Sequence, residues 1–373
     1  MTNSSTHSQT VQALFQPFNL GNLTLPNRIV MAPMTRGFSP NGVPGQNVAD
    51  YYRRRAEGGV GLIITEGTLI NHPASASNPN YPSFYGEAAL KGWAEVVASV
   101  HGAGGLIFPQ LWHEGTTRKI GALPNLEALP VGPSGITSAG VKVNEPLTET
   151  EIAEIVQAFA QAAADAKRIG FDGIEIHGAH GYLIDEFFWD KTNHRTDRYG
   201  GSLVARTLFA AEVIAACRLA VGPDFPIVLR ISQWKESTYT SQLAKNPDEL
   251  LQFLTPLVNA GVDIFHCSTR RFWEPEFEGS ELNFAGWVKK LTGKPTITVG
   301  SVGLDEEFLS SFGGKGSGTA SIDKVLVRLE QGEFDLVAVG RALLVDPEWP
   351  HKIKDGRNDE LKPFTKEAFG TLS

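Results

Sequence analysis

The sequence has few cysteines, no long apolar run and no excess of basic residues. Its two cysteines, Cys217 and Cys267, stand in a helix-like and a strand-like stretch, so we expect neither a disulfide framework nor a paired-cysteine metal site. A reduced, cytoplasmic setting fits best. The polar N-terminus MTNSSTHSQT lacks the apolar segment of a signal peptide. No apolar stretch reaches the length that crosses a bilayer, so we expect no membrane partner.

The charge balance is acidic, with 41 Asp and Glu residues against 33 Lys and Arg residues and a formal net charge of -8. Proteins that bind nucleic acid usually present a basic patch to the phosphate backbone, so this balance argues against such a partner. The one local basic cluster, Arg53–Arg55, lies in a helix-like stretch. We interpret it as a solvated helix face.

Eight short apolar runs recur along the whole chain and have the character of buried strands. Near-continuous apolar strands indicate burial on both faces of a parallel sheet. The runs lie near residues 28–34, 61–67, 106–112, 173–177, 226–232, 263–268, 296–301 and 335–340.

Helical patterns separate these runs. The clearest spans 149–169, where Thr148 and Glu151 have the spacing of a capping box, and others lie at 86–102, 203–221 and 247–260. Alternating strands and helices predict a parallel α/β sheet, and eight units predict a closed barrel. An open doubly wound sheet is the alternative, but no GxGxxG follows the first strand.

We therefore expect one (β/α)8 TIM-barrel domain over residues 1–373. Residues 1–12 are expected to be a flexible tail and residues 350–373 a C-terminal extension. Residues 113–147, rich in Gly and Pro, are long enough for a lid after strand three. Residues 270–295 form an extended loop after strand six.

In such a barrel the active site lies at the carboxyl ends of the strands. Gly300-Ser301 ends strand seven and Gly340-Arg341 ends strand eight. Barrels often bind phosphate with the loops after these two strands, because glycine lets backbone N–H groups approach and arginine offers a fork of donors. The alternative is two ordinary turns and a surface arginine.

Arg230 interrupts an apolar strand, and a buried guanidinium must be paired. It is either in an internal ion pair, with Glu66 or Glu175, or a cation held against a group that becomes anionic.

His177 and His180 would face opposite sides of an ideal strand. The small residues around them allow a turn that brings both imidazoles together, as hydrogen-bond donors or as metal ligands with Glu66. Glu66 and Asp185 are the only nearby candidates for further ligands, so a metal site is the weaker alternative and we expect no metal.

From about Leu14 to Trp349, the sequence resembles the old yellow enzyme family of flavin oxidoreductases. Two motifs are specific and the others support them. The specific motifs are HGAHGYLIDEFF (177–188) and NHRTDRYGGS (193–202), and the supporting ones are PNRIVMAPMTR (26–36), LIITEG (62–67), QLWH (110–113) and VGRALLVDP (339–347).

The resemblance implies a TIM barrel with tightly bound, non-covalent FMN, reduced by NAD(P)H. It implies that His177 and His180 bind the oxygen of an activating carbonyl or nitro group, that Tyr182 donates a proton, and that Trp112 and Trp273 contact the substrate. The FMN phosphate would lie at Gly300, Ser301, Gly340 and Arg341. The flavin contacts would come from Ala32, Pro33, Met34, Thr35, Gly67, Gln110 and Arg230.

The implied activity is reduction of the activated C=C bond of small electrophilic alkenes. Two other functions stay open: a metal-dependent barrel hydrolase that uses His177 and His180, and a non-catalytic flavin-binding protein. The sequence also departs from one branch of the family, which has Cys at the place of Thr35 and Tyr at that of Gly37. No arginine finger for a neighbouring subunit is evident near the C-terminus, so the oligomeric state stays open, and we expect a monomer or a homodimer.

Overall fold

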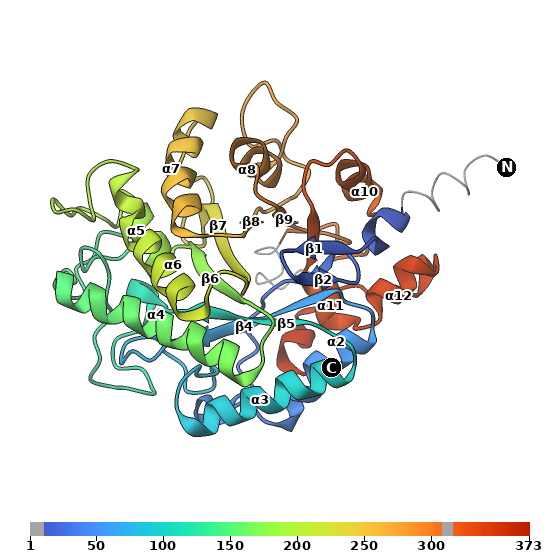
Figure 1. The fold of residues 1–373 in the computed structure, drawn as a ribbon, viewed down its shortest axis with the longest axis horizontal. Coiled ribbons are helices and arrows are strands. Elements are labelled where there is room, and N and C mark those ends of the chain that lie inside the picture. Colours follow the sequence, from blue (N-terminus) through green and yellow to red (C-terminus); the bar gives the residue numbers. More distant parts are fainter. Residues whose placement is uncertain (1–10, 308–315) are drawn as a thin grey trace.

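A closed barrel of eight parallel strands forms the centre of the molecule (Figure 1). The computed structural model describes residues 11–307 and 316–373, so most of the tail expected at 1–12 lies outside the described residues. The predicted TIM barrel and its eight strands are confirmed. The barrel strands are β3 (Ile29–Met31), β4 (Leu62–Leu69), β5 (Ile107–Trp112), β6 (Ile174–His180), β7 (Ile227–Lys235), β8 (Ile264–Ser268), β9 (Thr296–Val299) and β10 (Leu336–Val339).

Each strand pairs with the next along the chain, and β10 closes the barrel against β3, with Val337 opposite Ile29. Two places break the regular pairing, one between Ile64 and Gly67 on β4 and one between Gly178 and His180 on β6. Such irregularities change the direction of side chains and are frequent beside active sites.

Helices connect the strands on the outside of the barrel. Thr148 and Glu151 form the predicted capping box at the start of α4. Along the described residues, no helix has the length and apolar character that crossing a bilayer needs. The longer helices are α2 (Gln46–Glu57), α3 (Glu87–Gly102), α4 (Glu149–Ile169), α6 (Leu208–Val221), α7 (Pro247–Ala260), α8 (Phe284–Thr292) and α10 (Asp323–Glu330). The shorter ones are α5 (Leu183–Phe188), α11 (Arg341–Val345) and α12 (Trp349–Lys354).

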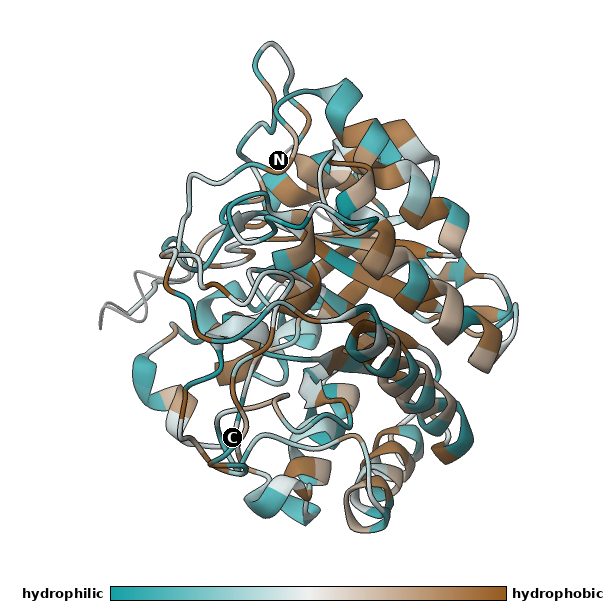
Figure 2. Cartoon of the chain, turned by 90° about the vertical axis from the view of Figure 1, so that its left-hand side faces the viewer, coloured by the Kyte–Doolittle hydropathy of each residue, from teal (hydrophilic) through white to brown (hydrophobic). Residues whose placement is uncertain are grey.

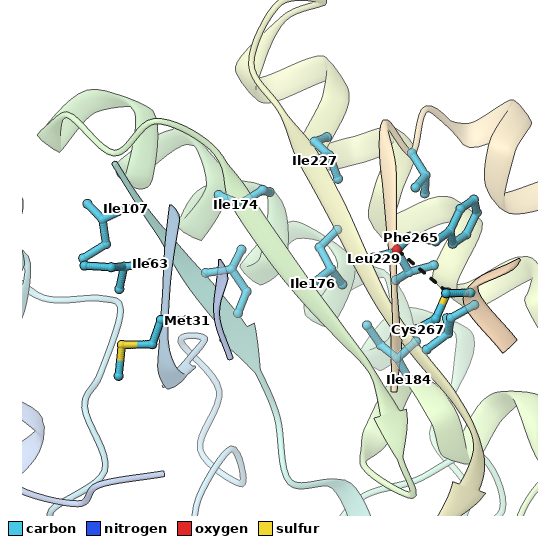
Figure 3. Packing of buried hydrophobic residues seen from close by; sticks show 14 of the residues in the cluster. Met31, Ile63, Ile107, Ile174, Ile176, Ile184, Ile227, Leu229, Phe265 and Cys267 are labelled. Atoms are coloured by element: carbon cyan, nitrogen blue, oxygen red, sulfur yellow. Dashed lines mark hydrogen bonds between the residues drawn. The ribbon is translucent and has the colours of Figure 1, made fainter. Parts of the chain in front are cut away.

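Alternate residues of the strands form two separate cores. Residues such as Ile63, Ile174, Ile176 and Leu229 point outward and pack under the helices (Figure 3). The helices carry polar residues beside their apolar ones, as Figure 2 shows. The apolar character of both strand faces follows from this double burial.

The inward residues form the second core, which a short hairpin covers at the amino ends of the strands. The hairpin consists of β1 (Phe18–Leu20) and β2 (Leu23–Leu25), and was not predicted. Its Leu20 and Leu25 belong to one apolar cluster with Phe108 and the first residues of β4, β8 and β10. This end of the barrel is therefore closed.

The interpretation of Arg53–Arg55 as a solvated face is wrong for Arg55. This side chain is fully buried and donates hydrogen bonds to the backbone oxygens of Leu343, Leu344 and Ser373. Arg54 likewise donates to the backbone oxygen of Leu372. These contacts hold the C-terminal segment after α12 against α2.

The two long connections are only partly irregular. Residues 113–147 contain the short helix η3 (Gly115–Thr117) and a backbone bridge between Ile136 and Lys142. The loop expected over 270–295 ends earlier, because α8 begins at Phe284.

Candidate active site

A cavity of about 840 Å³ opens at the carboxyl ends of the strands, and seven of the barrel strands and the segment that follows β3 contribute to its wall. This volume is in the range of cofactor and substrate sites. The structure brings nearly every site residue expected from the sequence to this cavity. They are Ala32, Pro33, Met34, Thr35, Gly67, Gln110, Trp112, His177, His180, Tyr182, Arg230, Gly300, Ser301, Gly340 and Arg341.

Trp273 is the exception. It stands on the connection between β8 and α8, but it lines a different cavity, beside Leu282 and Asp323. Its backbone oxygen accepts a hydrogen bond from Arg328 of α10, which holds the loop toward that side. The expectation that Trp273 shares a pocket with Trp112 is therefore corrected.

His177 and His180 converge because β6 is irregular between them. His180 has a φ of 68°, a left-handed conformation that is uncommon for a residue with a side chain. The turn brings the two imidazole rings to 5.2 Å between centroids, at nearly a right angle. Trp234 stacks on the His180 ring with centroids 4.5 Å apart.

Both imidazoles are neutral. Burial, and then the charge of Arg230, holds the pKa of His177 and that of His180 well below the ordinary range. The His177 Nδ1 accepts a hydrogen bond from the Ala179 N–H at 3.3 Å, which places the ring proton on Nε2. His177 can therefore donate from Nε2 to a ligand. The His180 Nε2 lies 2.8 Å from the Ser268 hydroxyl, which fixes the orientation of that ring.

Tyr182 caps the N-terminal end of α5 and completes the group. Its ring centroid lies 5.0 Å from that of His177 and 5.1 Å from that of Trp112. Burial, and then the nearby Glu236 carboxyl, raises the pKa of Tyr182 well above its ordinary value. The phenol is therefore protonated throughout the neutral range and can serve as an acid.

A layer of polar side chains lies below this group, inside the barrel. Glu175 accepts hydrogen bonds from the Gln110 amide at 2.8 Å and from the His266 Nδ1 at 2.7 Å. These three side chains and the neighbouring Arg230 are buried. Because Gln110 donates its NH₂ to Glu175, its amide oxygen is left to accept a hydrogen bond from a ligand.

Arg230 makes no ion pair with Glu66 or Glu175 among the described residues, and its buried Nε has no hydrogen-bond partner there. Glu175 is occupied by Gln110 and His266. The Glu66 carboxylate accepts hydrogen bonds from the backbone N–H groups of Arg36 and Gly37. A buried guanidinium is costly without an anionic or hydrogen-bonding partner. Of the two interpretations of Arg230, this favours a cation held for a ligand.

The ends of β9 and β10 lie together on the opposite side of the cavity. Gly300 has a φ of 148°, and a Cβ there would lie 2.6 Å from the Thr269 hydroxyl, so only glycine fits. Arg341 begins α11, and its guanidinium donates to the backbone oxygens of Glu306 and Glu307. Arg270 lies on the same wall, 3.6 Å from the Glu307 carboxylate.

These features fit FMN. The ring would be held by the wall from Ala32 to Thr35, by Gln110 and by the guanidinium of Arg230. The phosphate would be held near Gly300, Ser301 and Gly340 by Arg341, with Arg270 beside it. A phosphate dianion is a suitable partner for two guanidinium groups.

The glycine at position 67 has a steric explanation. A Cβ at this position would lie 2.6 Å from the Trp112 ring, so glycine lets Trp112 lie flat along the cavity wall. Trp112 in turn contacts Tyr81 and Tyr182. The glycine thus shapes the site whether or not it contacts a ligand.

Sequence reasoning missed Trp234, Glu236, Ser268 and Arg270, all of which line the cavity. The apolar run that contains Arg230 predicts a strand as far as Ser232, whereas β7 continues for three more residues to Lys235. A strand of that length would have identified Trp234. The hydroxyl of Ser268 at the end of β8 was an available signal of the same kind.

The metal-site alternative has no support from this arrangement. In the described ranges 11–307 and 316–373, no group of three or more His, Cys, Asp or Glu side chains is placed to hold a metal ion. Glu66, the ligand that this alternative needed, faces backbone N–H groups.

Comparisons with known proteins agree with this geometry. The model of the NADH:flavin oxidoreductase / NADH oxidase family matches residues 13–360. A curated NADH oxidase of Thermoanaerobacter brockii is 37% identical over 96% of this chain, which spans 53% of that protein. The 12-oxophytodienoate reductase 7 of Oryza sativa is 33% identical over 96% of this chain and 91% of its own length.

Among solved structures, morphinone reductase in complex with tetrahydroNAD superposes with a TM-score of 0.79 at 30% identity, and covers 95% of this chain and 93% of its own. The family binds FMN and takes NAD(P)H as its reductant. Because the family model matches almost the whole chain and the cavity fits the cofactor, this protein belongs to the old yellow enzyme family of FMN-dependent NAD(P)H oxidoreductases.

Proposed function

We propose that the protein reduces the activated C=C bond of α,β-unsaturated carbonyl or nitro compounds, in two alternating half-reactions. The observation that carries the proposal is the convergence of two neutral imidazoles and one phenol above the place where Arg230 and Gln110 would hold the flavin. The names of two relatives agree with such substrates, since they are a 12-oxophytodienoate reductase and a morphinone reductase.

Arg230, Gln110 and the wall from Ala32 to Thr35 would hold the FMN ring, which would supply hydride transfer from NAD(P)H to the β-carbon of the alkene. The protein's own groups stabilise the charges that develop. Arg230 offers a fixed cation to the part of the flavin that becomes anionic, in a site where water is scarce. Thr35 offers a hydroxyl to the ring from the cavity wall.

His177 and His180 bind the oxygen of the activating group. Because both rings are neutral, they act as hydrogen-bond donors whose protons stay on the rings. Negative charge moves to the substrate oxygen as the β-carbon receives hydride, and donors already in place stabilise it without reorganisation. The hydrogen bonds of His177 to Ala179 and of His180 to Ser268 set the ring orientations in advance.

Tyr182 then donates its hydroxyl proton to the α-carbon. Its raised pKa keeps the proton on the phenol at neutral pH, so the acid is present when the substrate binds. The ring contacts with His177 and Trp112 fix the phenol next to the atom that the imidazoles position.

An anaerobic titration in two steps tests the function. NADPH or NADH should bleach the yellow colour of the holoenzyme, and an enone such as cyclohexenone should then restore it. A protein that is bleached but not reoxidised by any enone or nitroalkene would not be an ene-reductase. A protein that is never bleached would be a flavin-binding protein without this activity.

A further inference from the structure

A carboxyl group that takes no part in the steps above lies beside the proton donor. The Tyr182 hydroxyl lies 3.4 Å from both carboxylate oxygens of Glu236, the residue that follows β7. Glu236 lines the cavity and is exposed to solvent. It is thus in contact with the donor on one side and with water on the other.

The two residues are held together by the fold. Lys235 and Asp185 form an ion pair of 2.7 Å in which both side chains are fully buried. The second Asp185 oxygen accepts from the Gly181 N–H at 2.7 Å, and the Glu236 N–H donates to the His180 oxygen at 3.3 Å. The end of β7 is therefore fastened to the turn that carries Tyr182.

Each turnover leaves Tyr182 without its hydroxyl proton. When the Tyr182 O–H bond breaks and the α-carbon gains its C–H bond, a phenolate remains. Burial, and then Glu236, makes that anion unfavourable, as the raised pKa of Tyr182 indicates. The phenolate must regain a proton before the next substrate can be reduced.

We propose that Glu236 is the proton relay of Tyr182: its carboxyl O–H breaks as the Tyr182 O–H re-forms, and the resulting carboxylate takes a proton from water. The inference rests on the proposed role of Tyr182 as the donor. Per turnover, one hydride comes from NAD(P)H and one proton from solvent, so the reaction balances.

The surroundings of Glu236 make the protonated form of its carboxyl easier to reach than it is in water. The residue as a whole is exposed, and the partial burial of its carboxyl at the cavity wall raises its pKa, against the opposing effects of the Tyr182 hydroxyl and the Arg230 charge. The titratable and charged groups that face it from neighbouring elements are Tyr81, Glu114, His180, Tyr182, Arg230 and Tyr239.

The test is a comparison of first and later turnovers in the FMN-loaded Glu236→Gln variant. The variant keeps the shape of the side chain and loses its ionisable proton. In the first turnover Tyr182 is already protonated, so we expect the rate to stay within about twofold of the wild type. Later turnovers in dilute buffer should slow by about tenfold or more, and added formate or imidazole should restore them.

Glu276→Gln is the matched control. Glu276 accepts a hydrogen bond from Gln233 on β7 but does not line the cavity. Its replacement removes a carboxyl near the same strand and should leave first and later turnovers alike.

A double variant keeps the test decisive if Glu236→Gln disturbs the site more broadly. In Tyr182→Phe there is no phenol to reprotonate, so adding Glu236→Gln should cause no further loss. Later turnovers that stay at the wild-type rate, a loss that no added acid restores, or a full extra loss in the double variant would overturn the relay. If instead Tyr182→Phe reduces substrate at the wild-type rate in the first turnover, the donor assignment itself fails.

Discussion

The two ends of the barrel are built from the same strands and differ in what their inward positions carry. Phe108, Val228 and Ile264 fill the closed end together with the hairpin. Two residues further along the same strand faces stand Gln110, Arg230 and His266. Every second residue of a strand points inward. Moving to the next inward residue along each strand therefore changes an apolar core into a polar site. The closed end supplies stability and the open end supplies chemistry.

In the layer between the two ends, the Glu175 carboxylate accepts hydrogen bonds from the Gln110 amide and from the His266 Nδ1. Arg230, one strand further, keeps an Nε without a partner in the described part of the chain. A cofactor that meets Arg230 and Gln110 from above would complete the layer, so the protein with FMN should be more stable than the protein without it.

The largest effect should come from the closed end. Phe108→Ala removes a fully buried ring that packs over Gly173, where a Cβ would lie 2.5 Å from it. We expect a loss of about 3–5 kcal/mol in the free energy of unfolding, measured by urea denaturation of the FMN-loaded protein. The matched change Leu219→Ala, at a side chain that is 89% exposed, should cost little. Equal losses would mean that the closed end is not a packed core.

The next effect separates the two half-reactions at the open end. Tyr182→Phe should slow reduction of the alkene by about 100-fold or more, because the proton donor is lost. Flavin reduction by NAD(P)H should remain nearly intact. Stopped-flow absorbance of the flavin measures both steps, and an equal loss in both would contradict the assignment of Tyr182.

A smaller effect concerns the imidazole pair. His177→Ala should weaken binding of phenol-like ligands, which mimic the anionic oxygen of the intermediate, by about tenfold, the equivalent of about 1.4 kcal/mol. Titration of the flavin spectrum measures this affinity. His101→Ala is the control, because His101 lies on the surface beside Asp172. Unchanged phenol affinity in the first variant would remove His177 from the site.

The last effect is a dependence of stability on pH, which is small when it is measured over a single pH unit. Burial raises the pKa of Glu186 to about 8, although the N–H and hydroxyl of Thr116 donate to its carboxyl. The native protein therefore retains this proton while the unfolded chain loses it above its ordinary pKa of 4.5. As pH rises from about 4.5 to 8, this group should lower the free energy of unfolding by at most about 1.4 kcal/mol per pH unit.

The variant Glu186→Gln checks this sign. It keeps a side chain of the same shape and has no proton to retain. The difference in unfolding free energy between wild type and variant should therefore shrink or reverse as pH rises over this interval. A difference that is constant with pH would show that Glu186 does not titrate in this way.

The sequence predicted the barrel well because its signal is local. Strands buried on both faces read as continuous apolar runs, and Thr148 and Glu151 mark a helix start within four residues. The hairpin β1–β2 was not predicted, because strands of three residues are too short to show the alternation of apolar and polar residues. The site residues at strand ends could be listed because every strand of a parallel barrel ends on the same side.

The errors concern residues whose surroundings come from distant parts of the chain. Arg55 belongs to a run of like charges that indicates a solvated face, yet its partners are backbone oxygens nearly 300 residues away. Trp273 follows a strand end, but Arg328 of α10 holds its loop away from the cavity. Glu236 was missed because its importance depends on Tyr182, which lies on another strand–helix unit.

The most direct test of the account is to determine which carbon of the product receives each of the two added hydrogens. Reduction of cyclohexenone in D₂O with unlabelled NADPH should place one deuterium on the α-carbon and none on the β-carbon, and NADPH labelled at the transferred position should place its label on the β-carbon. This is expected if hydride passes through the flavin and Tyr182 supplies the proton. Solvent deuterium on the β-carbon, or label from NADPH on the α-carbon, would contradict it.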